Sequence, residues 1–226
     1  MLTWNLKHGR SVPGSGRDLL AEFGGALAGW DWDVALLQEV PPWWPASLGR
    51  RLDASARLVL TSRNALLPLR RAAARRWPDA IKSNGGGCNA ILVRGERSIV
   101  EHRKWRLRVV PERRWLHGVL LSCGVWVGNL HAQGTLREAC EAGATVLRWA
   151  GTGAGAGAAA RSVVLGGDFN VHSLTLDRFT RAAGHNADHV FVAGFAAVPG
   201  SARVLDRGRL SDHAPVVVAV ATPTTA

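Results

Sequence analysis

The sequence predicts an α/β fold in which two packed β-sheets are flanked by helices. The chain has many short strand-like runs with few helical segments between them, which is typical of two sheets packed face to face. Some runs, such as residues 163–165, are apolar at every position, so both of their faces should be covered. The 226 residues, of which 47% are hydrophobic, suit one domain with a sizeable core.

The segment up to residue 93 is predicted to hold one helix, at residues 17–29, where apolar residues recur at helical spacing. Strands are expected at residues 2–6, 33–40, 57–60 and 89–93, with Pro41 and Pro42 ending the second of them. A glycine-rich turn is expected at residues 83–87. Between the third and fourth strands lies a basic stretch that contains Arg63, Arg70, Arg71, Arg75, Arg76 and Lys82.

The remaining chain is predicted to add two helices and further strands. The helices are expected at residues 135–149 and 174–183. A loose Gly, Ala and Thr loop at residues 151–160 lies inside a single domain that spans residues 1–226 and ends in a tail at 221–226. Strands are expected at residues 98–110, 115–121, 125–131, 162–165, 190–192, 203–205 and 216–220.

The chain has an excess of positive charge, with 28 Lys and Arg residues against 17 acidic residues and a net charge of +11. This excess favours nucleic acid as a partner, with anionic membrane lipid second, although an arginine-rich composition would give the same count. No run reaches transmembrane length and the N-terminus lacks a signal peptide, so we expect a cytoplasmic protein without a membrane span. The three cysteines have no metal-binding spacing and are expected to be reduced.

Polar and ionisable side chains stand at the ends of several apolar strands. A strand that only needs to be buried does not require them, because such groups are costly to desolvate unless they are paired or bind a cation. We therefore predict a metal site that cleaves phosphate esters. The groups are Asn5, Glu39, Asn129 with His131, Asp168 with Asn170, Asp188, and Asp212 with His213.

Asp168 and Asn170 end the run Gly166-Gly167-Asp168-Phe169-Asn170. If the chain is extended here, these two side chains share one face, because successive strand side chains point to opposite faces. An acid beside an amide can orient a water molecule and hold a phosphate oxygen, and the glycines allow another backbone or a ligand to approach closely. Ordinary turn residues would give the same pattern.

Asp212 and His213 precede the strand expected at residues 216–220. His213 could protonate, bind a phosphoryl oxygen or bind metal, and Asp212 could be an oxygen ligand of a divalent cation. The alternative is a capping aspartate beside a surface histidine. Glu39 follows an apolar run and needs a partner, which is either a cation or one of the arginines.

Asn129 and His131 should share one face of a strand by the same alternation. Asp188 stands just before another apolar strand. Its carboxylate could hold His213 in one tautomer, as carboxylates commonly do for imidazoles that take part in catalysis. By itself, an aspartate at this position is equally well explained as a turn residue.

The order and local context of these residues resemble the endonuclease/exonuclease/phosphatase superfamily, the fold of pancreatic deoxyribonuclease and the exonuclease III-type enzymes. The resemblance covers residues 2–220, and the pieces around Asp168 and His213 are specific in combination. The matching pieces are Thr3-Trp4-Asn5, Leu37-Gln38-Glu39, Asn129-Leu130-His131, Gly167-Asp168-Phe169-Asn170, Asp188-His189-Val190-Phe191 and Ser211-Asp212-His213-Ala214-Pro215.

This resemblance implies a four-layered α/β sandwich that hydrolyses phosphate esters with Mg²⁺ or Mn²⁺. Glu39 would hold the metal, with Asn5 and Asp212 close to it. The implied set is physically coherent, since four carboxylates in one cleft would repel one another unless a cation and an imidazolium offset them.

The resemblance also implies roles in the chemistry. Asp168 would orient or deprotonate the attacking water. His213, paired with Asp188, would stabilise the pentacovalent phosphorus. The residues that would contact the scissile phosphate are Asn129, His131 and Asn170.

The chain departs from the family pattern in three respects. It has no Tyr, which the exonuclease III-type branch commonly has in its third region, and offers His131 instead. The stretch between Asn170 and Asp188 is short, so loops that grip abasic DNA could be missing. Ala187 and His189 stand where the family often has an aliphatic and an aromatic residue.

Three functions are compatible with this pattern. The first is a metal-dependent nuclease that acts on DNA or RNA, expected to be a monomer. The basic segment at residues 57–76 supports this function, because a basic surface would bind phosphates without reading sequence. Trp43 and Trp44 could stack on unpaired bases or pack at a sheet end. The second is the same site acting on a small or lipid-borne phosphoester. The third is a non-catalytic binding module, against which the acids at Glu39 and Asp168 argue.

Overall fold

The structure is a computed structural model that describes residues 1–62, 64–79, 87–152 and 162–221. Arg63, Lys82, most of the predicted glycine-rich turn, most of the predicted loop at 151–160 and all but the first residue of the predicted tail lie outside these residues. Among the described residues, no helix combines the length and apolar character needed to cross a membrane.

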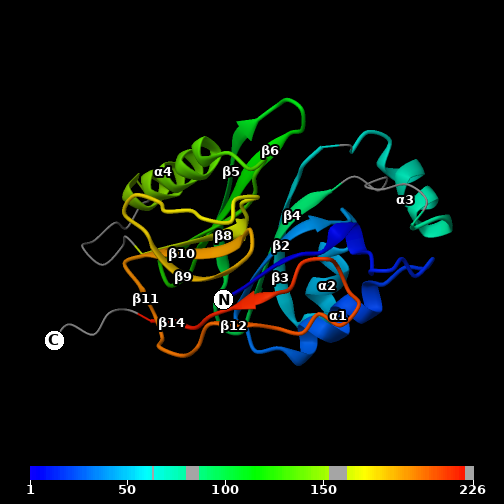
Figure 1. Ribbon diagram of the computed structural model, residues 1–226, viewed down its shortest axis with the longest axis horizontal. Coiled ribbons are helices and arrows are strands. Elements are labelled where there is room, and N and C mark those ends of the chain that lie inside the picture. The colour runs from blue at the N-terminus through cyan, green and yellow to red at the C-terminus, as the bar shows by residue number, and fades with distance from the viewer. Residues whose placement is uncertain (63, 80–86, 153–161, 222–226) are drawn as a thin grey trace.

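Two six-stranded mixed sheets form the centre of the molecule (Figure 1). A short pair, β11 (Ala196–Ala197) with β14 (Val220–Ala221), lies beside them. The first sheet has the order β12 (Arg203–Val204), β13 (Val216–Val217), β1 (Leu2–Asn5), β2 (Val34–Val40), β4 (Cys88–Arg94), β3 (Ala54–Leu60). The second has the order β5 (Ile99–Arg108), β6 (Arg114–Leu121), β7 (Trp126–His131), β8 (Val163–Asp168), β10 (Asp188–Ala193), β9 (Thr180–His185).

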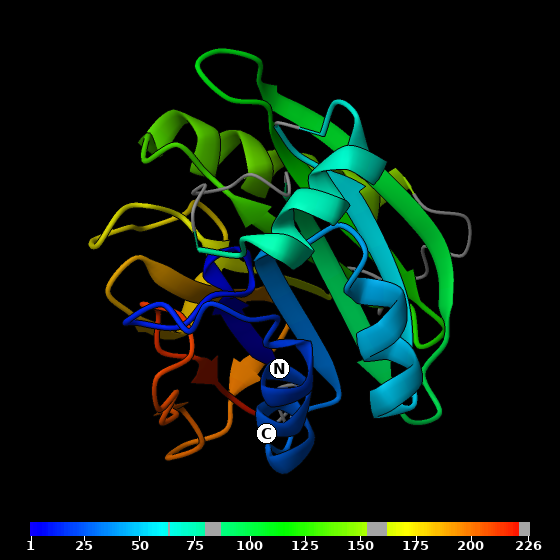
Figure 2. The same cartoon turned by 90° about the vertical axis from the view of Figure 1, so that its right-hand side faces the viewer.

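Helices cover the outer faces of both sheets. The helices α1 (Leu20–Gly29) and α2 (Pro45–Leu52) pack on the first sheet, and α4 (Leu136–Thr152) packs on the second. Figure 2 shows α3 (Leu67–Arg76) at the surface, and this helix has no buried residue. The predicted class, a four-layered α/β sandwich of two mixed sheets flanked by helices, is confirmed.

The alternation of side chains along the strands builds three apolar layers. On β8, Val163 and Leu165 face α4, whereas Val164 faces the first sheet. On β2, Leu36 packs between the sheets and Leu37 packs under α1 and α2. Both faces of these apolar runs are therefore covered, as their composition predicts.

Several predicted elements differ from the structure. The helix predicted at residues 174–183 is wrong: Leu174 and Leu176 pack against α4 without forming a helix, and the following residues form β9, which pairs with β10. The helices α2 and α3 and the strands β9 and β11 were not predicted, and the strand predicted at residues 216–220 is divided into β13 and β14. The cysteines Cys88, Cys123 and Cys140 are free thiols.

One edge of the molecule receives the ends of the central strands of both sheets. The pairs β1–β2 and β7–β8 are parallel, so their carboxyl ends meet there. Gly167 allows β8 to lie close to β7 at this edge, because it has φ +141° and a Cβ there would collide with the Leu130 carbonyl. The predicted close backbone approach at this glycine is thus present.

Candidate active site at the strand ends

The predicted polar residues gather at this edge from both sheets. Asn5 ends β1, His131 ends β7 and Asp168 ends β8. Asp188 begins β10, which runs antiparallel to β8 and places Asp188 directly opposite Asp168. His213 lies in the loop before β13, a strand antiparallel to β1.

Asp168 is buried and held by hydrogen bonds on both carboxylate oxygens. Its Oδ2 accepts a bond from Asn5 Nδ2 at 2.9 Å, and its Oδ1 accepts one from the Asn170 backbone N–H at 2.9 Å. The same Oδ2 lies 3.6 Å from His131 Nε2 and 3.9 Å from His213 Nε2. One carboxylate oxygen of the second sheet therefore faces two imidazoles.

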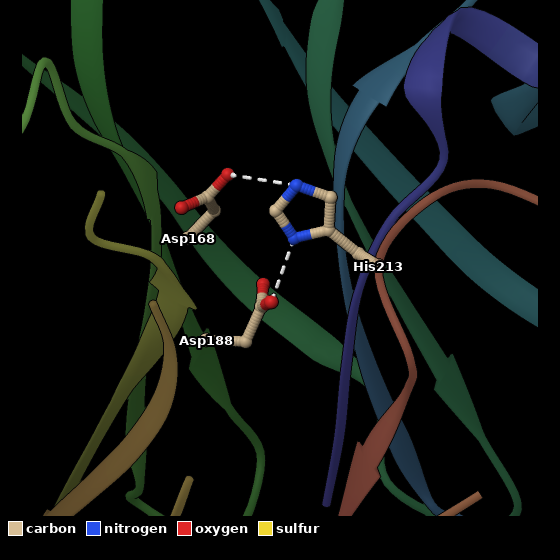
Figure 3. A group of neighbouring side chains, drawn as sticks. All are labelled: Asp168, Asp188 and His213. Atoms are coloured by element: carbon tan, nitrogen blue, oxygen red, sulfur yellow. Dashed lines mark hydrogen bonds and ion pairs between the residues drawn. The ribbon is translucent and has the colours of Figure 1, made fainter. Parts of the chain in front are cut away.

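His213, which is half-buried, forms a hydrogen-bonded pair with the buried Asp188 (Figure 3). Nδ1 of His213 lies 2.7 Å from Asp188 Oδ2, and the ring stands between this carboxylate and that of Asp168. Although burial opposes it, the hydrogen bond and the charge of Asp188 raise the pKa of His213 to about 9. Burial raises the pKa of Asp188 to about 6 despite this bond. The pair therefore holds one proton near neutral pH, and it resides on His213.

This protonation state can be measured directly. In metal-free wild-type protein, we expect the His213 ring to titrate at about pH 9 in a histidine NMR titration. In Asp188→Asn, the charge that favours the imidazolium is gone while burial still disfavours it, so the pKa of His213 should fall below about 7. A wild-type His213 that titrates near 6.5 would show that the pair is not an ion pair.

The loop that carries His213 is fixed onto β1 by two side chains. The indole Nε1 of Trp4 donates to the His213 carbonyl at 2.9 Å. The buried Ser211 Oγ donates to the Asn5 carbonyl at 2.6 Å and accepts from the His213 backbone N–H at 3.1 Å. These contacts explain why a Trp precedes Asn5 and a Ser precedes the Asp212-His213 pair: both position the imidazole.

A bulge directs Glu39 to the same edge. The pairing of β2 with β4 shifts between Leu37 and Val40, and Glu39 has φ +49°. Bulges re-aim side chains. Oε2 of Glu39 lies 3.3 Å from His8 Nε2, and Oε1 lies 3.9 Å from His131 Nδ1. Burial raises the pKa of Glu39, and the neighbouring charge of Asp168 adds to this rise although His131 opposes it.

His131 and Asn170 both belong to this group. Burial lowers the pKa of His131 to about 4, although Asp168 opposes this, so the ring is neutral at neutral pH. Asn170 has φ +52°, and its Nδ2 donates to the Ala132 carbonyl at 2.9 Å. The structure thus places His131 between Glu39 and Asp168, and Asn170 beside Asp168.

Asn129 requires a correction. It shares a face with His131, as the alternation predicts, but it is completely buried between the sheets. Its Nδ2 donates to the carbonyls of Leu37 and Ala90, and its Oδ1 accepts from Gln38. A phosphate could reach this amide only by breaking core hydrogen bonds, so Asn129 joins the two sheets and does not bind phosphate.

The three predicted metal ligands have different partners. Asn5 donates to Asp168 and its Oδ1 accepts from the Lys7 backbone N–H at 2.9 Å. Asp212, with 49% of its side chain exposed, is paired with Lys7 Nζ at 2.5 Å. Glu39 is half-buried, with 25% of its side chain exposed, and its ion-pair contacts are both with imidazoles.

Geometry alone offers another acidic and imidazole cluster that could hold a metal ion. Ligand atoms of Asp168, Asp188 and His213 lie within 4.8 Å of one another. However, Nδ1 of His213 is bonded to Asp188, and an imidazolium cannot ligate a cation. Glu39 lies outside this cluster, and its two carboxylate oxygens, which are hard donors, lie beside the imidazoles of His8 and His131.

Sequence reasoning missed three basic residues beside the site. Lys7 and His8 follow Asn5 in a tight turn, η1 (Lys7–Gly9), and contact Asp212 and Glu39 respectively. Arg114, 8% exposed, starts β6 and donates from Nε to Gln133 at 3.1 Å, and its charge acts on both Glu39 and His131. Lys7 and His8 stand two and three residues after Asn5, and this position was the available sign that they belong to the site. No feature of the sequence marks Arg114 as a site residue.

The indoles of Trp43 and Trp44 lie against the core under α1 and α2, and Trp44 is buried. Packing at a sheet end, the alternative considered for these residues, is therefore what the structure shows. Base stacking by Trp44 is excluded by this burial.

Comparison with known proteins gives a consistent result. A model of the Endonuclease/Exonuclease/phosphatase family matches residues 2–213. No curated protein sequence matches the chain significantly. The fold is similar to that of an endonuclease/exonuclease/phosphatase protein from Beutenbergia cavernae DSM 12333, with 19% identity and a TM-score of 0.68 over 98% of this chain and 70% of that one.

Two other solved structures match over nearly their whole lengths. A Bacteroides vulgatus endonuclease/exonuclease/phosphatase protein has 13% identity and a TM-score of 0.71, with 98% of each chain covered. A mannosyl-6-phosphatase of Bacteroides thetaiotaomicron VPI-5482 has 16% identity and a TM-score of 0.64, with 97% of this chain and 98% of that one covered. At these identities the likeness shows the fold.

Proposed function

The chain belongs to the endonuclease/exonuclease/phosphatase family, whose members hydrolyse phosphate esters, and we propose that it is a nuclease that cleaves DNA or RNA with the help of Mg²⁺ or Mn²⁺. The observation that carries this proposal is the position of the His213 ring. It stands between the carboxylates of Asp188 and Asp168, with Nδ1 bonded to the first and Nε2 3.9 Å from the second.

The His213–Asp188 pair is suited to stabilise negative charge on phosphorus. The 3.9 Å between His213 Nε2 and Asp168 Oδ2 is longer than a hydrogen bond, so the Nε2 proton is available to an oxygen placed between them. A phosphoryl oxygen there would receive a charge-assisted hydrogen bond. Asp188 keeps the ring charged and fixes its orientation.

Asp168 is suited to activate the attacking water. Asn5 and the Asn170 backbone N–H fix both of its oxygens, so the carboxylate is already oriented before substrate binds. It would accept the proton as water attacks phosphorus in line with the leaving oxygen. The neutral ring of His131 and the amide of Asn170 lie beside it and would contact the phosphate.

Glu39 would hold the divalent metal in this proposal. A metal bound there would polarise the phosphoryl oxygen and stabilise the leaving oxyanion. The chain's own residues support this role, because an imidazole lies beside each Glu39 oxygen and burial makes an added positive charge favourable. Asn5 and Asp212 would lie close to the bound metal. Each of them already contacts Lys7 of the η1 turn.

Nucleic acid as the substrate is supported by charge. The net charge of +11 favours a polyanion, and contacts to phosphates need no sequence recognition. The test is hydrolysis of plasmid, single-stranded DNA and RNA with Mg²⁺. Product from the wild-type protein that vanishes with EDTA and returns with Mg²⁺ is the expected result.

Glu39→Gln is expected to lower the Mg²⁺-dependent rate about 10²-fold to 10³-fold and to raise the Mg²⁺ concentration needed for half-maximal rate. The reason is that an amide is a weaker ligand than a carboxylate for a hard cation. Glu96→Gln, an exposed residue in the turn between β4 and β5, is the matched control and should leave both quantities unchanged. Equal rates for wild type and Glu39→Gln would remove Glu39 from the site.

A small or carbohydrate-linked phosphoester is the second candidate. Its support is the fold similarity to the mannosyl-6-phosphatase, which covers 97% of this chain. The same substrate panel decides between the two. Turnover of soluble sugar phosphates or small phosphodiesters without any cleavage of DNA or RNA would favour this candidate.

A further inference from the structure

Nearly all of the net charge lies in one quarter of the sequence. Between Arg57 and Arg113 the chain has 14 Lys and Arg residues and 4 acidic residues, which is +10 of the total of +11. Three of these four acids are already bonded within the fold: Asp79, Glu101 and Glu112. The rest of the chain carries a net charge close to zero.

The first part of this charge lies in the excursion between β3 and β4, which carries α3. The excursion leaves and rejoins the first sheet beside the site. Thr61 donates to the Gly87 carbonyl from its backbone N–H at 3.0 Å and from its hydroxyl at 2.9 Å. A Cβ on Gly87 would lie 3.4 Å from His8 Cε1, and His8 contacts Glu39. The base of the excursion therefore lies against His8, which contacts Glu39, the proposed metal ligand.

The second part lies on the β5–β6 hairpin, which ends at the same place. The Arg113 backbone N–H donates to Ser62 Oγ at 2.5 Å, which joins the hairpin to the excursion. The next residue, Arg114, acts electrostatically on Glu39 and His131. Figure 1 shows that α3 stands away from both sheets, beyond the ends of β3 and β4. One end of each basic segment thus lies near the site.

The exposed cations of these two segments form a surface that we name the basic flank: Arg71, Arg75 and Arg76 of α3, and Lys104, Arg106 and Arg113 of the hairpin. Large apolar side chains stand among those of α3. Leu66 is 70% exposed, Leu69 65% and Trp77 56%, and the Arg76 guanidinium lies 5.4 Å from the Trp77 ring centroid. Exposed apolar and aromatic side chains of this size mark an interaction surface.

We propose that the basic flank binds single-stranded nucleic acid that continues from the phosphate held at the site. This inference rests on the proposed function and specifies its substrate. The arginines match the backbone phosphates, and the exposed Trp77 with Leu66 and Leu69 offers faces on which unpaired bases can stack. A duplex presents phosphates but hides its base faces, so it would leave these apolar side chains without a partner.

The test measures binding without turnover, by fluorescence anisotropy of a 20-nucleotide single strand in EDTA as NaCl is varied. R71Q/R75Q/R76Q should weaken binding at low salt at least about tenfold and make the slope of log K against log[salt] shallower by about 2, since three phosphate contacts are lost. Trp77→Ala should weaken binding about tenfold with an unchanged slope, because stacking releases no counterions.

Two controls make the result specific. R50Q/R97Q/R203Q removes three exposed arginines elsewhere and should leave the slope as in the wild type. R71K/R75K/R76K keeps the charge and should keep the binding. Because α3 has no buried residue, melting temperatures of the flank variants should match the wild type.

Three results would overturn the proposal: equal affinity and slope for the flank and control variants, tighter binding of a duplex of the same length, or preference for phosphatidylserine vesicles over the single strand. Failure of the proposed function is read separately, from the wild-type protein's turnover of bis-p-nitrophenyl phosphate with Mg²⁺. Turnover without flank-dependent binding rejects only the flank, and flank-dependent binding without turnover of any phosphoester rejects only the nuclease.

Discussion

Asp168→Asn is expected to lower kcat for phosphodiester hydrolysis about 10³-fold with little change in KM. Hydrogen bonds from Asn5 and from the Asn170 backbone N–H fix both oxygens of this carboxylate at the centre of the site. An amide of the same shape cannot accept the proton of the attacking water. Steady-state kinetics on a labelled oligonucleotide with saturating Mg²⁺ measure the effect.

A matched double variant separates loss of the base from loss of the local hydrogen bond. N5D/D168N keeps the net charge and lets the two side chains still bond each other, but moves the carboxylate to β1. We expect it to be as slow as Asp168→Asn alone. Recovery of the wild-type rate in the double variant would mean that only the charge of the site matters and that Asp168 is not the base.

Asp188→Asn is expected to lower kcat at pH 8 by about 10²-fold to 10⁴-fold, because the required imidazolium at His213 would be lost. In the wild type, the pair is in its active form between the pKa of Asp188, about 6, and that of His213, about 9. Activity should therefore fall above about pH 9 and below about pH 6. Without Asp188 the pKa of His213 falls, so the alkaline limit should move below about pH 7.

His213 and Asp188 should act as one unit. His213→Gln should have an effect at least as large as Asp188→Asn, and D188N/H213Q should be no slower than His213→Gln alone. The full pH profile of kcat for the three variants measures this. Additive losses in the double variant would indicate that Asp188 and His213 serve separate steps.

The sequence predicts most strands of the two sheets and most of the site. Fully apolar runs identify buried strands, and acids or imidazoles at their ends indicate one common edge, which is where Asp168, Asp188 and His213 meet. The wrong helix at residues 174–183 shows the limit. Its apolar spacing is real, but pairing with β10 and packing on α4 outweigh local helical preference there.

The sequence does not show how deeply a side chain is buried in the sandwich, or where a turn directs its side chains. Alternation gave the correct face for Asn129 but not its burial, because the face of a strand does not say how far the second sheet extends over it. The positive φ of Lys7 and of His8 directs both side chains back onto acids that are distant in the sequence, Asp212 and Glu39. Pro45 at the start of α2 was an available helix signal.

The most direct test of the central claim is a crystal structure of the protein soaked with Mn²⁺, with the ion located by anomalous scattering. A peak within about 2.2 Å of a Glu39 carboxylate oxygen, with the His213–Asp188 hydrogen bond intact, is the predicted result. A peak bound instead by Asp188 and a deprotonated His213, with Glu39 apart from it, would contradict the assignment of the imidazolium and the metal to separate places in the site.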